Sequence, residues 1–175
     1  MDSFYPFDIN SKRMIMKMNI STFWKLGNAY FQVHEMKDNS IKAYWRKALP
    51  DRKFAECAGD IERKYFSDNN MTIKELIITD EYKKEIDIIS PINEISFSDE
   101  EARQIVDLCN NGLPDDYVGI GGRDGHSYDI WFENRRRFHL WCIVHESLIT
   151  VADVINLLLK KAGLDEKMYG IRVRK

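Results

Sequence analysis

The chain is poor in cysteine and lacks long apolar runs, and each of these absences excludes a class of protein. Cys57, Cys109 and Cys142 are odd in number and widely spaced, so they are expected to be reduced, buried residues and not a disulfide framework or zinc site. No run of about 18 apolar residues is present, so no membrane-spanning helix is expected. The first residues lack the charged and apolar regions of a secretory signal. We therefore expect a cytoplasmic protein without a membrane partner.

A strong charge of either sign is also missing, since the formal net charge is −2. A dedicated nucleic-acid binder needs Lys and Arg gathered on one face, so nucleic acid is not an expected partner. The acidic residues are concentrated in the middle of the chain, where residues 51–100 contain 13 Asp or Glu against 7 Lys or Arg. This bias would suit a basic protein partner, although solvated surface is its commoner meaning.

The clearest pattern in the chain is a β-hairpin over residues 126–144. Apolar and polar residues alternate on both sides of a polar turn, and Asp124-Gly125 precedes the first strand. A three-residue loop, 134–136, would place Glu133 opposite Arg137 and collect the apolar residues on one face, whereas a two-residue loop would mix the faces. The apolar face would then contain Tyr128, Ile130, Phe132, Phe138, Leu140, Cys142 and Val144.

The opposite face of this hairpin is the candidate protein-binding site. It would carry Asp129, Trp131, Arg137, His139 and Trp141. Trp and Arg are enriched at binding hot spots, and a histidine among them would add pH sensitivity. A second interpretation is that another segment covers these residues and makes a second core layer. The sequence leaves both open.

Two amphipathic helices flank the hairpin. Ser98 and Glu101 form a capping box that starts a helix over residues 98–111. Thr150 is expected to cap a second helix over residues 150–163, which Gly163 would end. Their buried stripes, Ile105, Val106, Val154, Ile155 and Leu158, should pack against Tyr128, Ile130, Phe138 and Leu140. A third helix is predicted over residues 51–66.

The remaining segments predict strands at residues 13–20, 29–36, 41–47, 72–79 and 85–89. Together these elements indicate a single α+β domain spanning residues 1–175. Its antiparallel sheet of about five to seven strands would carry about three helices, packed mainly on one face.

The N-terminal part also admits a helical interpretation. Leu26-Gly27, Tyr30 and Ala48 resemble one tetratricopeptide repeat, which would make this part a helical adaptor. Tyr30 and Ala48 are 18 positions apart where the repeat needs about 16, and no second copy follows. We therefore prefer strands.

The sequence contains no recognisable catalytic or cofactor-binding motif. His126, His139, Cys142 and His145 lack metal-ligand spacing, and in a strand His139 and Cys142 would point to opposite faces. The glycine-rich stretch 119–125 leads into a strand and does not open a helix, unlike a phosphate-binding loop. No cofactor or metal is expected. The alternative function is a small enzyme with a site near Asp124, His126 and His139.

The pattern Asp124-Gly125-x-x-Tyr128, then Arg137-Phe138-His139-x-Trp141 and a helix ending Ala162-Gly163-Leu164, resembles a group of uncharacterised bacterial α+β domains. The resemblance covers residues 95–164. It implies a non-catalytic protein-binding domain of bacterial immunity or accessory type, with no catalytic residues to carry over.

Overall fold

The structure is a computed structural model that describes residues 9–22, 28–47, 90–111, 125–134, 136–164 and 169–174, and the single positions 75, 79, 80, 84, 87 and 88. Its elements follow the chain as β1 (Arg13–Thr22), β2 (Ala29–Glu35), β3 (Ile41–Lys47), β4 (Asn93–Ser96), α4 (Asp99–Asn111), β5 (His126–Phe132), β6 (Arg137–Trp141), β7 (Ile143–His145), η1 (Glu146–Leu148), α5 (Ile149–Lys161) and β8 (Arg172–Arg174).

Six of these strands form one antiparallel sheet in the order β4-β3-β2-β1-β5-β6. The chain is therefore α+β, as predicted. β1 lies between β2 and β5, so the first strand of the described chain pairs with a strand more than 100 positions later. β7 and β8 make a separate parallel pair.

The strand interpretation of the N-terminal part is confirmed for residues 29–47, and the tetratricopeptide alternative is wrong there. Ala29, Phe31 and Val33 are all buried, which is the period of two that a strand requires. A tight turn joins β2 to β3, in which the N–H of Met36 donates to the carbonyl of Ser40 at 2.9 Å and Asn39 adopts a φ of 64°. The chain thus reverses in a hairpin and not between two helices.

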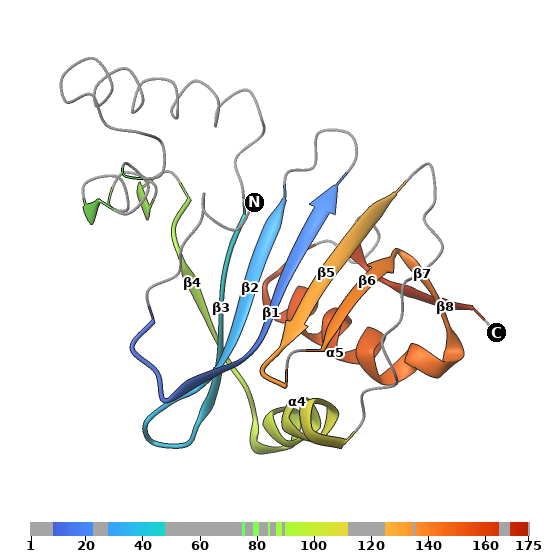
Figure 1. Cartoon of the computed structure of the whole chain (residues 1–175), viewed down its shortest axis with the longest axis horizontal. Coiled ribbons are helices and arrows are strands. Elements are labelled where there is room, and N and C mark those ends of the chain that lie inside the picture. Colours follow the sequence, from blue (N-terminus) through green and yellow to red (C-terminus); the bar gives the residue numbers. More distant parts are fainter. Residues whose placement is uncertain are drawn as a thin grey trace, which may run out of the picture.

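The hydrophobic core lies between one face of the sheet and α5, with α4 below the strand ends at the bottom of the view (Figure 1). The predicted packing is confirmed, because both helices share one buried cluster with the hairpin, Val106 being only partly buried. This cluster includes Met18, Ile20, Phe31, Ile105, Tyr128, Ile130, Phe138, Leu140, Val154, Ile155 and Leu158.

The two helices begin differently. The capping box of α4 is confirmed, because the N–H of Ser98 donates to Glu101 Oε2 at 2.8 Å and the N–H of Glu101 donates to Ser98 Oγ at 3.3 Å. The predicted Thr150 cap is wrong, since α5 already includes residue 149 and continues directly from η1. The side chain of His145 caps η1 by accepting the N–H of Ser147 at 3.2 Å. Gly163, with a φ of 67°, ends α5 as predicted.

The hairpin has the predicted faces but not the predicted register. Trp131 pairs with Arg137, and the N–H of Phe132 donates to the carbonyl of Arg136 at 3.0 Å, so the strands are displaced by two positions from the expected pairing of Glu133 with Arg137. A shift of two leaves every side chain on its expected face. The second predicted strand is also divided, because residue 142 interrupts it and β7 pairs with β8 instead of β5.

The predicted helix at residues 51–66 lies outside the described residues. Within the strands predicted at 72–79 and 85–89, the described positions Glu75, Asp87 and Ile88 are helical, so those predictions fail there. Short isoleucine-rich stretches do not distinguish strand from helix by periodicity. In the part of the chain that is described, no helix combines the length and the hydrophobicity needed to cross a membrane.

Candidate functional site

The candidate binding residues lie on the sheet face opposite the core, over β1, β5 and β6. The strand register arranges them in parallel rows. Lys17, Trp131 and Arg137 make one row and Asn19, Asp129 and His139 the next, followed by a row that contains Trp141. We call these seven residues the Trp131 face. All five residues predicted for the site are therefore brought together.

Trp131 is held between two cations on neighbouring strands. Lys17 Nζ lies 4.7 Å from the centroid of its ring, and Arg137 Cζ lies 5.2 Å from it. Both distances are within the range of a cation–π interaction. The ring is half-buried while Arg137 is exposed, so Trp131 is oriented without being removed from the surface.

The next row contains an exposed histidine–carboxylate pair. His139 Nδ1 lies 2.8 Å from Asp129 Oδ1, and the two side chains are 45% and 40% exposed. The sequence predicted that these residues share a face, and the register makes them direct cross-strand partners. The pair gives the face a polar boundary beside Trp131.

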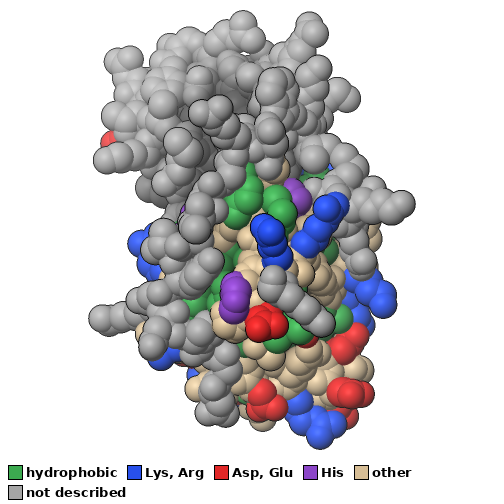
Figure 2. Space-filling model, turned by 90° about the vertical axis from the view of Figure 1, so that its right-hand side faces the viewer, with side chains coloured by type: hydrophobic (Ala, Val, Ile, Leu, Met, Phe, Trp, Pro, Cys, Tyr) green, Lys and Arg blue, Asp and Glu red, His purple; other side chains and the backbone are tan. Residues whose placement is uncertain are grey.

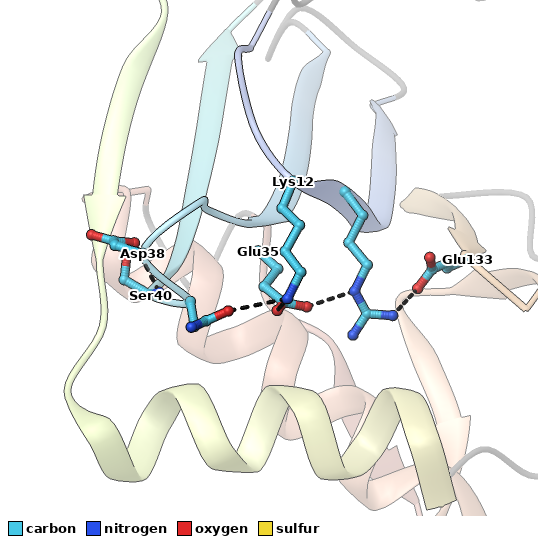
Figure 3. A network of polar contacts seen from close by, with 7 residues as sticks. Lys12, Glu35, Asp38, Ser40 and Glu133 are labelled. Atoms are coloured by element: carbon cyan, nitrogen blue, oxygen red, sulfur yellow. Dashed lines mark hydrogen bonds and ion pairs between the residues drawn. The ribbon is translucent and has the colours of Figure 1, made fainter.

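The predicted contact between Glu133 and Arg137 is not formed. Glu133 Oε2 instead accepts from Arg13 Nη1 at 2.6 Å, in a network in which Arg13 Nε also donates to Glu35 Oε2 at 2.6 Å (Figure 3). Lys12 donates to the other oxygen of Glu35 at 2.6 Å. These donors hold the pKa of Glu35 below its usual value. This network ties β1 and β2 to the hairpin turn, and it leaves Arg137 beside Trp131.

The same face of the sheet continues over β2 and β3 and includes two buried polar side chains. His34 is buried, and its ring nitrogens lie 2.8 Å from Ser11 Oγ and 2.9 Å from Gln32 Oε1. Arg46 is fully buried and forms an ion pair with Asp87. On this face of β2 and β3, His34 and Arg46 are buried and Gln32 is half-buried. On β5 and β6, Ser127 is buried, Trp131 and Trp141 are half-buried, and Arg137 and His139 are exposed.

The two described residues of the enzyme alternative, His126 and His139, are not brought together. His126 lies on the core side of β5, where it contacts the ring of Tyr128 edge-on with centroids 5.4 Å apart. Burial lowers the pKa of His126, and its Nε2 lies 3.3 Å from the carbonyl oxygen of Gly170. His139 lies on the opposite face of the sheet, and Asp124 lies outside the described residues. The sheet therefore separates the two histidines.

Other chemical candidates are accounted for structurally. Among the described residues, no three His, Cys, Asp or Glu side chains are grouped as metal ligands. Burial raises the pKa of the Cys109 thiol to about 12, so this thiol is not a reactive nucleophile. Gly125 has a φ of 135°, and a Cβ there would lie 2.8 Å from Cys142 Sγ, so a glycine is required both by the backbone conformation and by the close approach of this residue, just before β5, to Cys142 between β6 and β7.

A second exposed area lies along β7 and β8. Ile143 and Val173 are exposed there, and Figure 2 shows hydrophobic, basic, acidic and histidine side chains together on this side of the molecule. It carries no aromatic–cation arrangement among the described residues, so it serves below as a comparison surface.

Sequence reasoning missed Lys17 and Asn19. Both were assigned correctly to a strand, but no local pattern indicates that β1 lies beside β5. Comparison with known proteins adds no identification: no family model, no curated protein and no solved structure matches the chain. The resemblance over residues 95–164 therefore stays an expectation.

Proposed function

We propose that the protein is a non-catalytic protein-binding domain and that the Trp131 face is its binding surface. The observation that carries the proposal is Trp131, half-buried and held between Lys17 and Arg137 on the side of the sheet that the core does not use. An aromatic ring already fixed by its neighbours loses little conformational freedom when a partner covers it. Trp and Arg are also the residue types that dominate binding energy at protein interfaces.

The chemistry elsewhere supports binding over catalysis. His34 and His126 are buried with lowered pKa values and have structural hydrogen-bond partners. The His139 and Asp129 side chains are 45% and 40% exposed, so water reaches this pair. The exposed His139–Asp129 pair fits a polar rim beside an aromatic anchor.

The decisive variant is Trp131→Ala/Trp141→Ala. The matched control is Ile143→Ala/Val173→Ala, which truncates two exposed apolar residues on β7 and β8. Each full-length protein is immobilised and exposed to lysate of its native host, and bound proteins are quantified. We expect one stoichiometric partner on the wild type and the control, and its loss on the tryptophan variant with folding retained. Equal recovery on all three would refute the proposal, and an unfolded tryptophan variant would assign the residues to the core.

An immunity or accessory role is the more specific part of the proposal, and it rests on the resemblance. An immunity protein neutralises a toxin whose gene is its neighbour, so a partner encoded beside this gene is expected. The test is to purify the neighbouring product and measure its inhibition by the wild type and by the tryptophan variant. A neighbouring product that this protein neither binds nor inhibits would contradict this role, without affecting the binding surface itself.

A further inference from the structure

The outward face of β7 and β8 gathers basic and histidine side chains. In the parallel register of the two strands, Ile143 pairs with Arg172 and His145 pairs with Arg174. These four side chains share one face because they alternate with Val144, which is buried. All four are exposed, and Figure 2 shows basic and histidine side chains on this side of the molecule. This face is separate from the Trp131 face, which lies on β1, β5 and β6.

Arg172 and Arg174 carry charges that the described part of the chain does not neutralise. No carboxylate among the described residues forms an ion pair with either guanidinium group. Glu146, which follows His145, is exposed and is also not paired with them. Residues two positions apart on a strand lie about 7 Å apart on the same side, so the two guanidinium groups can converge on one anion.

His145 adds a third donor beside Arg174. Its Nδ1 accepts the backbone N–H of Ser147 at 3.2 Å, so in the neutral ring the proton lies on Nε2. Among the described residues, no acceptor is bonded to this Nε2–H group. The cap of η1 thus fixes the ring and leaves one N–H to donate to a ligand. Arg174 lies between His145 and Arg172, so the three donors surround one position on this face.

We propose that this face of β7 and β8 binds the phosphate group of a phosphomonoester through Arg172, Arg174 and His145. A phosphomonoester carries about −1.5 to −2 charges near pH 7 and has three acceptor oxygens, which matches two guanidinium groups and one N–H. A carboxylate or a phosphodiester has a single charge and two free oxygens, so it would leave one arginine unmatched. Ile143, which is 52% exposed and lies opposite Arg172, offers apolar contact to the carbon group that carries the phosphate.

The test measures the binding of phenyl phosphate to the full-length ¹⁵N-labelled protein by NMR titration of the backbone amides. Benzoate, methyl phenyl phosphate and inorganic phosphate are the comparison ligands, because they replace the monoester by a carboxylate, a diester and a free phosphate. Arg172→Gln/Arg174→Gln removes the two guanidinium groups, and Arg172→Lys/Arg174→Lys keeps the charge without them. The matched control, Lys37→Gln/Arg103→Gln, removes the same charge from exposed positions in the β2–β3 turn and on α4.

We expect phenyl phosphate to bind the wild type and the control equally and to shift the amides of β7 and β8. The glutamine variant should bind it at least about tenfold more weakly, because charge-assisted bidentate bonds are lost. The lysine variant should be intermediate, since an ammonium group lacks the planar fork of a guanidinium group. The three comparison ligands should bind the wild type more weakly than phenyl phosphate does.

The inference is overturned if phenyl phosphate does not bind, or if benzoate, the diester or inorganic phosphate binds equally well. It is also overturned if the control loses as much affinity as the glutamine variant, or if the lysine variant binds as tightly as the wild type. Shifts confined to elements other than β7 and β8 would place the ligand elsewhere and would equally reject this site. None of these outcomes affects the proposed function, which concerns a different surface.

Discussion

Truncating two neighbouring residues of β6 should change the stability of the protein by very different amounts, because one side chain lies on the core face of the sheet and the other on the Trp131 face. Phe138 is 2% exposed and meets Phe132 edge-on with ring centroids 5.8 Å apart. His139, the next residue, lies on the Trp131 face and contacts Asp129. We predict that Phe138→Ala strongly destabilises the protein and that His139→Ala does not.

The magnitudes follow from burial. Truncating a fully buried phenylalanine costs about 3–5 kcal/mol, because the apolar contacts are lost and a cavity remains. Losing an exposed ion pair changes stability by no more than about 1 kcal/mol. With a urea dependence of about 2 kcal/mol per molar, Phe138→Ala should lower the unfolding midpoint by about 1.5–2.5 M and His139→Ala by less than about 0.5 M.

The assay is urea unfolding followed by far-ultraviolet circular dichroism, with His139→Ala as the internal control. Equal losses for both substitutions would mean that the Trp131 face is a second core layer. A loss below about 1 kcal/mol for Phe138→Ala would place Phe138 outside the core and would refute the assigned faces of β6.

Three further predictions concern stability. Burial lowers the pKa of His34 and His126 below the usual 6.5, so these histidines bind protons more tightly in the unfolded chain than in the folded protein. The unfolding midpoint in urea should therefore fall as the pH drops below about 6.5. An unchanged midpoint between about pH 7.5 and 5 would contradict this prediction. Gly125→Ala should lower the free energy of unfolding in a denaturant titration by about 1–3 kcal/mol, because the new Cβ clashes with Cys142 Sγ and the backbone conformation is strained for alanine. Adding Cys142→Ala should restore the part of this loss that is due to the clash and leave the part that is due to backbone strain. Ser98→Ala should cost about 1 kcal/mol by calorimetry, and no loss would mean that the capping box is not formed in solution.

Much of the fold was predictable where neighbouring residues determine the structure. The faces of β5 and β6 follow from alternation, and the start of α4 follows from Ser98 and Glu101, because both signals act over a few residues. The predicted register of the hairpin was wrong by two positions, but the predicted faces were correct, because side chains alternate along a strand with a period of two. The five predicted site residues were therefore found together.

The remaining features depend on contacts between distant segments. Placing Lys17 beside Trp131 requires β1 to insert between β2 and β5, which no local pattern encodes. The expected contact between Glu133 and Arg137 is absent, and the Glu133 carboxylate is bound instead by Arg13, which lies 120 positions away in the sequence. Thr150 has the right residue type for a cap, but η1 starts the helical region earlier and His145 takes that role.

NMR mapping of the bound partner shows directly whether the Trp131 face is the binding surface. The captured partner is added to ¹⁵N-labelled protein, and shifts of backbone amides and indole N–H groups are recorded. We expect shifts at Trp131, Trp141 and the amides of β5 and β6, with α5 unchanged. Shifts confined to β7 and β8, or to α4 and α5, would contradict it.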